Sequence, residues 1–380
     1  MANAVAEKSQ GALKDHFVKL TPGKLTGLRL ITDSNNRFKV LALDQSNSFK
    51  KALRAMHEKA GDRALGEEVS ATKAAGKPTR PAEPSYEEIR DTKVEMVRVL
   101  GEHASATLLD VNFGARQALN ALSIPKHVGL IVRSEASKDP GIPSECEPGW
   151  SVEKIKRMGA AAVKLLVYLD TEDAANVKAQ IAFVEKVAKA CQEQDILLMT
   201  EELSFPRKGE DKSTPSYKAR KVKNILEATR LIGPATDILK LEFPGNMKDD
   251  STQQMVDNLG KLDEAAMRPW VLLSAGEKFD LFVKQVELAM KAGCSGYMAG
   301  RAIFNEYFDQ PDAGARANFL KSTGCDRMKT LNKVVDAHAK SWLDRYGITP
   351  KELAAAVSPD WYLDGAKAAQ AAKSSGQGEY

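Results

Sequence analysis

Histidine, cysteine and long apolar segments are scarce in this chain of 380 residues. The five histidines are scattered, so we expect no cluster of imidazoles that could hold a catalytic zinc ion. The four cysteines are widely spaced and contain no CxxC pair, which indicates reduced thiols. No stretch approaches the roughly 20 apolar residues that span a bilayer, and the first residues lack the apolar core of a signal peptide. We therefore expect a cytoplasmic protein without a metal site.

A strong excess of one charge is also missing, since 55 basic residues face 51 acidic residues and the formal net charge is +4. This mixed distribution gives no reason to expect nucleic acid or a membrane surface as a partner. Hydrophobic residues make up 43% of the chain, which is enough for a sizeable core. The length fits one large α/β barrel as well as it fits two ordinary domains.

Short apolar runs alternate with longer amphipathic stretches, a pattern that is typical of β/α units and a parallel sheet. Eight runs can be counted, the number that a closed barrel requires. The predicted strands are 39–44, 106–110, 128–133, 161–170, 195–201, 237–244, 270–276 and 295–301. Helices are predicted between them, for example over 151–159, 171–194 and 278–293, where apolar residues recur three and four positions apart.

A doubly wound open sheet is the alternative fold, and it would place a glycine-rich phosphate loop after the first strand. The first strand here is followed by DQSNSFKK, which matches neither GxGxxG nor GxxxxGK[ST]. The sequence therefore favours a single-domain (β/α)8 TIM barrel of the α/β class. The alternation of strands and helices is the only internal repetition.

We expect the barrel to occupy residues 37–305, after an N-terminal segment over 1–36. The polar stretch 61–88 contains prolines and glycines, which predicts an insertion after the first strand, either an active-site lid or a disordered excursion. A C-terminal helical extension is expected over 306–370. The tail 371–380 is predicted to be disordered.

Nearly every predicted strand carries polar residues near its carboxyl end, where β/α barrels place their active sites. In strand order these residues are Asp44 and Gln45; Asp110; Arg133 and Glu135; Lys164 and Tyr168; Glu201 and Glu202; Lys240 and Glu242; Ser274 and Gly276; and Gly300 and Arg301. A purely structural core does not bury this many charged groups. The mouth of the barrel is therefore the predicted active site.

Lys240 and Lys164 are the most informative of these residues, because each is flanked by Val, Ile or Leu within a strand. Period-two alternation puts Ile238, Lys240 and Glu242 on one face, which we expect to line the barrel lumen. A second cation beside a buried lysine favours the neutral amine, which attacks a carbonyl and forms an imine. Glu201, on the strand between the two lysines, could shuttle protons. The alternative is a buried Lys–Glu network of structural value only.

Two glycine-containing segments follow the seventh and eighth predicted strands. They contain Ser274 and Gly276 in one case and Gly300 and Arg301 in the other. Barrels often bind phosphate at this position through backbone N–H groups, a hydroxyl and an arginine fork. The alternative is that both segments are helix starts without a ligand.

The combined motifs resemble the class I tagatose 1,6-bisphosphate aldolases, a family that also includes sulfofructose 1-phosphate aldolases. The resemblance runs from about residue 20 to residue 304. It is carried by LALDQSNSFKKAL, ATLLDVNFG, WSVEKIKRMGAAAVKLLVYLD, LLMTEELSF, DILKLEFPGNMK, LSAG and AGRAIF. It implies a barrel that cleaves a ketose bisphosphate to dihydroxyacetone phosphate and an aldehyde through a protonated imine, without a metal or another cofactor.

The resemblance also implies roles for individual residues. It assigns the imine to Lys240 and acid/base chemistry to Glu201. Lys164 corresponds to a further lysine that the family carries within a barrel strand of the active site. The substrate contacts that it implies are Asp44, Gln45, Ser274, Gly276, Gly300 and Arg301, and Glu242 is added because it shares the predicted face of Lys240. Glu202 competes for the acid/base role, although the register of the following Leu203 and Ser204 favours Glu201.

The function predicted from the sequence is a metal-independent aldolase acting on tagatose 1,6-bisphosphate, or also on fructose 1,6-bisphosphate. One alternative keeps the chemistry and changes the substrate to 6-deoxy-6-sulfofructose 1-phosphate, which would give sulfolactaldehyde. Another, from a different class, is a regulatory protein that senses a sugar phosphate in the same pocket. The expected partners are a small sugar phosphate and further copies of the chain in a homo-oligomer.

Overall fold

The computed structural model of the chain describes residues 20–69, 83–355 and 357. Eight parallel strands close into a barrel in sequence order, with β1 paired to both β2 and β8. The strands are β1 (Phe38–Leu43), β2 (Ala106–Leu109), β3 (Gly129–Arg133), β4 (Ala162–Tyr168), β5 (Leu197–Leu203), β6 (Ile238–Leu241), β7 (Trp270–Leu273) and β8 (Gly296–Ala299). The predicted strands and the (β/α)8 barrel are confirmed.

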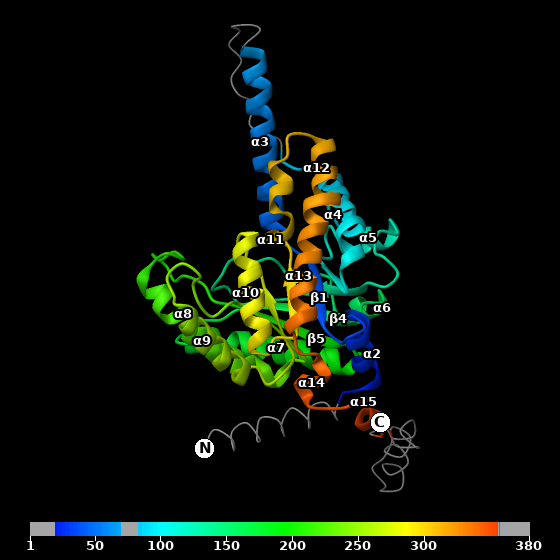
Figure 1. Cartoon of the computed structure of the whole chain (residues 1–380), viewed down its shortest axis with the longest axis vertical. Coiled ribbons are helices and arrows are strands. Elements are labelled where there is room, and N and C mark those ends of the chain that lie inside the picture. Colours follow the sequence, from blue (N-terminus) through cyan, green and yellow to red (C-terminus); the bar gives the residue numbers. More distant parts are fainter. Residues whose placement is uncertain (1–19, 70–82, 356, 358–380) are drawn as a thin grey trace.

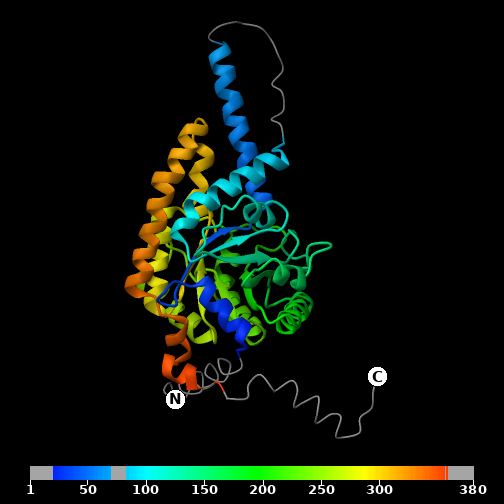
Figure 2. The ribbon, with the colours of Figure 1, turned by 90° about the vertical axis from the view of Figure 1, so that its right-hand side faces the viewer.

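Helices surround the barrel (Figures 1 and 2). The longer ones are α2 (Pro22–Ile31), α3 (Asn47–Val69), α4 (Tyr86–Leu100), α7 (Ala174–Glu193), α8 (Pro215–Ile232), α9 (Thr252–Ala265), α10 (Phe279–Ala292) and α13 (Cys325–His338). The shorter ones are η1 (Gly101–His103), α5 (Ala115–Asn120), α6 (Val152–Arg157), η2 (Gly233–Ala235), α11 (Arg301–Phe304), η3 (Asn305–Asp309), α12 (Ala313–Phe319), η4 (Leu320–Gly324), α14 (Trp342–Tyr346) and α15 (Pro350–Ala355). The three predicted helices correspond to α6, α7 and α10.

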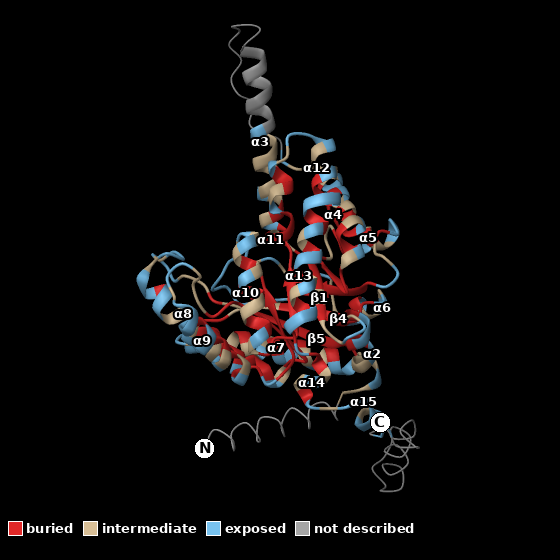
Figure 3. Cartoon of the chain, viewed as in Figure 1, coloured by how far each residue is buried: buried red, intermediate tan, exposed pale blue. Residues whose placement is uncertain are grey.

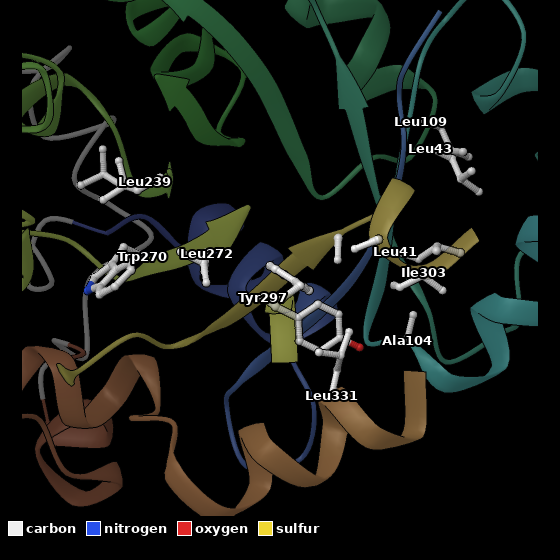
Figure 4. Packing of buried hydrophobic residues seen from close by; sticks show 14 of the residues in the cluster. Leu41, Leu43, Ala104, Leu109, Leu239, Trp270, Leu272, Tyr297, Ile303 and Leu331 are labelled. Carbon is white, nitrogen blue, oxygen red and sulfur yellow. The ribbon is translucent and has the colours of Figure 1, made fainter. Parts of the chain in front are cut away.

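Two apolar cores follow from the alternation of side chains along the strands. One core fills the lumen and includes Val40, Leu108, Ile131, Met199, Ile238 and Met298. The other lies between the strands and the helices, where Leu239, Leu272 and Tyr297 of the strands and Leu331 of α13 belong to one packed cluster (Figure 4). The strands are buried and the outer helix faces are exposed (Figure 3). Ile238 therefore points inward and Leu239 outward, as predicted.

The polar stretch expected as a loop after β1 begins instead as helix. Residues 61–69 continue α3, which runs away from the barrel (Figures 1 and 2), and residues 86–88 lie in the first turn of α4. Glutamate, alanine, leucine and arginine in this part of the stretch are good helix formers, which explains the continued helix. Residues 70–82 of the expected insertion lie outside the described residues.

The chain continues after the barrel as helices up to residue 355. Helix α13 packs beside α10, and the short helix α14 places Trp342 and Tyr346 against the lumen core. Leu28 and Ile31 of α2 join the same core, so α2 and α14 close the amino end of the barrel. The tail predicted over 371–380 lies outside the described residues. In the described part of the chain, no helix combines the length and the apolar character needed to cross a membrane.

Candidate active site

The carboxyl ends of the strands surround a cavity of about 460 Å3. Its lining includes Asp44, Gln45, Lys164, Glu201, Lys240, Glu242, Ser274, Gly300 and Arg301, all of which were predicted from the sequence. Gly276 instead lines an adjoining cavity of about 710 Å3, which shares Glu242 and Ser274 with the first. A pocket of a few hundred cubic ångströms is the size that small-molecule ligands occupy.

Lys240 and Glu201 are brought together by strand register. Glu201 of β5 pairs directly with Lys240 of β6, so both side chains point into the lumen from adjacent strands. Nζ of Lys240 lies 2.8 Å from Oε2 of Glu201, and both side chains are buried. Burial opposes ionisation of Glu201, but the two neighbouring lysines outweigh burial and hold the pKa of this carboxyl below its ordinary value. Glu201 therefore lies where an ionised carboxylate can accept a proton from the lysine nitrogen.

Lys164 is the centre of a buried cluster of carboxylates. Its Nζ lies 2.9 Å from Oδ2 of Asp44, 2.8 Å from Oε1 of Glu135 and 2.9 Å from Oε2 of Glu201. Burial opposes its charge, but these carboxylates outweigh burial and raise the pKa of Lys164 well above its ordinary value. Lys164 therefore remains a cation at neutral pH, which makes it suited to orient carboxylates rather than to attack a carbonyl.

Asp44 is fixed through its backbone as well as its side chain. The guanidinium of Arg133 donates to its carbonyl oxygen at 2.8 Å, and the ammonium of Lys93 donates to the carbonyl oxygens of Leu43 and Gln45, both at 2.9 Å. Burial opposes ionisation of Asp44, yet neighbouring cations, led by Lys164, hold its pKa well below the ordinary value. The end of β1 is thus anchored by buried cations.

Glu201 and Glu202 have different surroundings because adjacent strand residues face opposite sides. Glu202 is fully buried on the outer face of β5, where Ser204 donates to its Oε1 at 3.3 Å and Asn224 of α8 donates to it at 3.4 Å. Its Oε2 has no hydrogen-bond partner among the described residues. Burial and the nearby carboxylate of Glu242 raise the pKa of Glu202 well above its ordinary value. The geometry therefore favours Glu201 for proton transfer at Lys240.

The loop after β7 lies beside Arg301 at the start of α11. Ala275 and Gly276 both have positive φ, 47° and 80°. A Cβ on Gly276 would lie 3.2 Å from Cζ of Arg301, so glycine allows the guanidinium to approach the loop. A Cβ on Gly300 would lie 2.1 Å from the carbonyl oxygen of Ala42, so β8 and β1 come together only with glycine there. No side-chain hydrogen bond or ion pair of Arg301 is found within the described residues.

A protein-family model and the sequences of known proteins place this chain in a family. The family model described as DeoC/LacD family aldolase matches residues 53–306. The chain belongs to the DeoC/LacD family of aldolases. It is therefore an aldolase, a lyase that breaks a carbon–carbon bond.

Individual relatives agree with this assignment. Tagatose 1,6-diphosphate aldolase 2 of Streptococcus agalactiae serotype III (strain NEM316) is 29% identical over 352 residues, which covers 86% of this chain and 99% of the relative. Tagatose 1,6-diphosphate aldolase of Staphylococcus aureus (strain JH9) is 30% identical over 293 residues, which covers 69% of this chain and 87% of the relative.

Two solved aldolases share the fold of this DeoC/LacD family member. A fructose-bisphosphate aldolase from Plasmodium falciparum, solved in complex with TRAP and an inhibitor, has a TM-score of 0.56 at 12% identity and covers 88% of this chain and 96% of its own. An archaeal fructose 1,6-bisphosphate aldolase has a TM-score of 0.51 at 15% identity and covers 83% of this chain and 99% of its own. At these identities the likeness concerns the fold alone.

Two further residues of the aldolase site had no role assigned from the sequence: Glu135 was noted only as a polar residue near a strand end, and Lys93 was not noted. Glu135 binds Lys164, and it was recognisable as a polar residue shortly after a predicted strand. Lys93 is fully buried on α4 and binds Asp110, and burial lowers its pKa although that carboxylate opposes the shift. The sequence could have indicated that Lys93 is buried, because it lies four residues from Ile89 and from Val97 and so shares their apolar helix face. Among residues 20–69, 83–355 and 357, no group of three or more histidine, cysteine, aspartate or glutamate side chains is arranged to hold a metal ion.

Proposed function

We propose that this aldolase cleaves tagatose 1,6-bisphosphate to dihydroxyacetone phosphate and glyceraldehyde 3-phosphate through an imine on Lys240. The observation that carries the proposal is the contact between Nζ of Lys240 and Oε2 of Glu201, at 2.8 Å within a buried barrel mouth. The names of the relatives from Streptococcus agalactiae and Staphylococcus aureus support the choice of sugar.

In the first half of the proposed reaction, the Lys240 ammonium gives a proton to Glu201 and becomes a nucleophilic amine. The amine attacks the C2 carbonyl, and one proton of the attacking nitrogen passes to the carbonyl oxygen, which becomes the hydroxyl of a carbinolamine. Glu201 returns its proton to this hydroxyl, which leaves as water and produces a protonated imine. Glu201 is then a carboxylate again and is ready to act as a base.

In the second half, Glu201 takes the proton of the C4 hydroxyl and the C3–C4 bond breaks. The bonding electrons move into the protonated imine, so the aldehyde leaves and an enamine remains on Lys240. Glu201 then protonates C3, and water hydrolyses the new imine to release dihydroxyacetone phosphate. Lys164 takes no proton in this scheme, because its role is to hold the catalytic carboxylate in place.

The proposed substrate contacts follow from the lining of the cavity. The loop after β7, which contains Ser274 and Gly276, and the neighbouring Arg301 would bind the phosphate on C1, since backbone N–H groups and an arginine fork suit a dianion. Asp44, Gln45 and Glu242 would contact hydroxyl groups of the sugar, and Gly300 allows β8 and β1 to approach each other at this site.

The cytoplasm is the proposed compartment, in agreement with four free cysteines. The homo-oligomer stays a prediction, and light scattering tests it by measuring the molar mass in solution.

The experiment is a comparison of three ketoses in a coupled assay for dihydroxyacetone phosphate. We expect the highest kcat/KM with tagatose 1,6-bisphosphate, with fructose 1,6-bisphosphate as a further substrate. Preference for 6-deoxy-6-sulfofructose 1-phosphate would instead show that the reaction is correct and the sugar is wrong. Tight binding of all three ketoses without turnover would favour the regulatory alternative and contradict the proposed function.

A further inference from the structure

Arg133, at the end of β3, is a buried cation on the wall of the catalytic cavity. Its guanidinium donates to the carbonyl oxygen of Asp44 at 2.8 Å, to the hydroxyl of Ser137 at 3.1 Å and to the amide oxygen of Asn112 at 3.2 Å. Its Nε is buried without an acceptor among the described residues. All of its observed partners are neutral groups.

The buried lysines nearby are arranged differently, because each contacts a carboxylate. Lys93 binds Asp110, Lys240 binds Glu201, and Lys164 binds several carboxylates. In the described part of the chain, Arg133 has no carboxylate oxygen within 4.0 Å. The carboxylates of Asp44 and Glu135 do act on it electrostatically, but both are already bonded to Lys164. A buried cation without a direct counter-ion is costly unless an anionic ligand completes its environment.

The order of the strands puts Arg133 opposite the loops proposed for the C1 phosphate. In a closed ring of eight strands, β3 lies diametrically across from β7. Ser274 follows β7, whereas Lys240 projects from the neighbouring β6. A ketose attached to Lys240 through C2, with its C1 phosphate at the β7 loop, therefore extends its other end toward the side of the cavity that holds Arg133.

The loop after β3 supplies further donors on this side. Ser137 and Lys138 both line the cavity. Nζ of Lys138 lies 2.9 Å from the carboxylate of Glu145, whose side chain is 60% exposed, and 3.3 Å from the carbonyl oxygen of Pro143. A solvent-exposed pair of this kind contributes little to stability, so Lys138 can exchange Glu145 for a ligand at low cost. The loop also carries Asp139, whose charge is exposed at the cavity rim.

We propose that Arg133, Ser137 and Lys138 form the subsite for the anionic group at the far end of the ketose. The ligand class is a tetrahedral oxyanion on the terminal carbon, which both a phosphate ester and a sulfonate present. An arginine fork with a neighbouring ammonium and hydroxyl suits either group. This inference rests on the proposed function, and it deepens that function by naming residues that select a ketose with two anionic ends.

The test compares tagatose 1,6-bisphosphate with tagatose 1-phosphate, which lacks the distal anion. The wild-type enzyme is expected to prefer the bisphosphate. Arg133→Met and Lys138→Met should each lower kcat/KM for the bisphosphate by about 10- to 100-fold, as expected for loss of a charged hydrogen-bond partner. Lys138→Met should change kcat/KM for the monophosphate by less than about threefold. Arg133→Met should lower kcat/KM for the monophosphate by a smaller factor than for the bisphosphate, because Arg133 also holds the backbone of Asp44. Arg157→Met is the matched control, because Arg157 is exposed on α6 and contacts Glu153.

Each result separates the inference from the proposed function. A wild-type enzyme that cleaves both ketoses equally well contradicts the distal subsite only, whereas one that cleaves neither contradicts the proposed function. An equal loss on both substrates in Arg133→Met would show that Arg133 acts only by holding Asp44, which overturns its assignment. If that variant does not fold, Lys138→Met decides the matter, because an unchanged preference for the bisphosphate in this loop variant overturns the inference.

Discussion

Lys240 and Lys164 contact the same carboxylate oxygen, Oε2 of Glu201, at 2.8 and 2.9 Å. The two lysines differ in their remaining surroundings. Lys164 is also bonded to Asp44 and Glu135, whereas Glu201 is the one carboxylate that Lys240 contacts in the described part of the chain. Proton transfer to Glu201 can therefore release Lys240 as a free amine while Lys164 stays charged. This asymmetry supports the proposed roles of Lys240 as nucleophile and Lys164 as fixed cation.

Glu201→Gln is expected to lower kcat by about 10²- to 10⁴-fold, the usual contribution of a general acid–base group. Glutamine keeps the shape of the side chain but cannot accept a proton from Lys240. Glu202→Gln is the matched control, because that side chain faces away from the lumen and the change should alter kcat by less than about threefold. Steady-state kinetics with tagatose 1,6-bisphosphate measures kcat for both variants. A larger loss in the Glu202 variant would reverse the assignment.

The stability of the Glu202→Gln variant relative to wild type is expected to depend on pH. The raised pKa of Glu202 means that the folded state binds a proton more tightly than the unfolded state, whose carboxyl has the ordinary value of 4.5. The associated stability is present below that value and is lost as pH rises toward the folded pKa. The variant should therefore gain stability relative to wild type by about 1.4 kcal/mol per pH unit above pH 4.5, up to the folded pKa. Urea denaturation at several pH values measures the slope, and a flat difference would show that Glu202 titrates normally.

Lys164→Met is expected to lower the free energy of unfolding by about 3–5 kcal/mol, because it leaves buried carboxylates without their shared cation. The residue is almost completely buried and contacts Asp44, Glu135 and Glu201. Chemical denaturation at pH 7 measures the loss. Lys154→Met provides the control, since within the described residues the ammonium of Lys154 contacts only the exposed carbonyl of Gly149. Equal stability of the two variants would contradict the central role of Lys164 in the cluster.

Gly276→Ala should raise KM for the ketose bisphosphate by about tenfold, the equivalent of roughly one lost hydrogen bond to a charged group. The new methyl group would press on the guanidinium of Arg301 and strain a backbone with φ of 80°. Gly149→Ala isolates the strain, because Gly149 has φ of 72° but open space around it. Both variants should lose about 1–2 kcal/mol of stability. Only the first should change KM, and an unchanged value would remove this loop from the phosphate site.

The barrel could be predicted from the sequence because each strand is a short apolar run between amphipathic helices. The inward orientation of Lys240 was also predictable, since alternation fixes the faces once the lumen is assigned. The choice between Glu201 and Glu202 depended on register, because both are plausible carboxylates in one strand. The pairing of Glu201 with Lys240 across β5 and β6 favours Glu201.

Other parts of the site depend on contacts between residues that are far apart in the chain. Lys93 lies 50 positions after Leu43, whose carbonyl it binds, and Arg133 lies 89 positions after Asp44. Local patterns carry no information about such pairs, which form only when the ring closes. Glu135 follows the end of β3, where the alternation of a strand no longer fixes the direction of a side chain.

The most direct test of the account is to trap the imine on Lys240. Wild-type enzyme is incubated with dihydroxyacetone phosphate and reduced with borohydride, and the modified peptide is identified by mass spectrometry. We expect a reduced adduct on Lys240 of the wild-type enzyme and none on the Lys240→Arg variant, which keeps a cation but cannot form the imine. An adduct on Lys164, or no adduct on wild-type enzyme that is active, would contradict the assignment of the imine to Lys240.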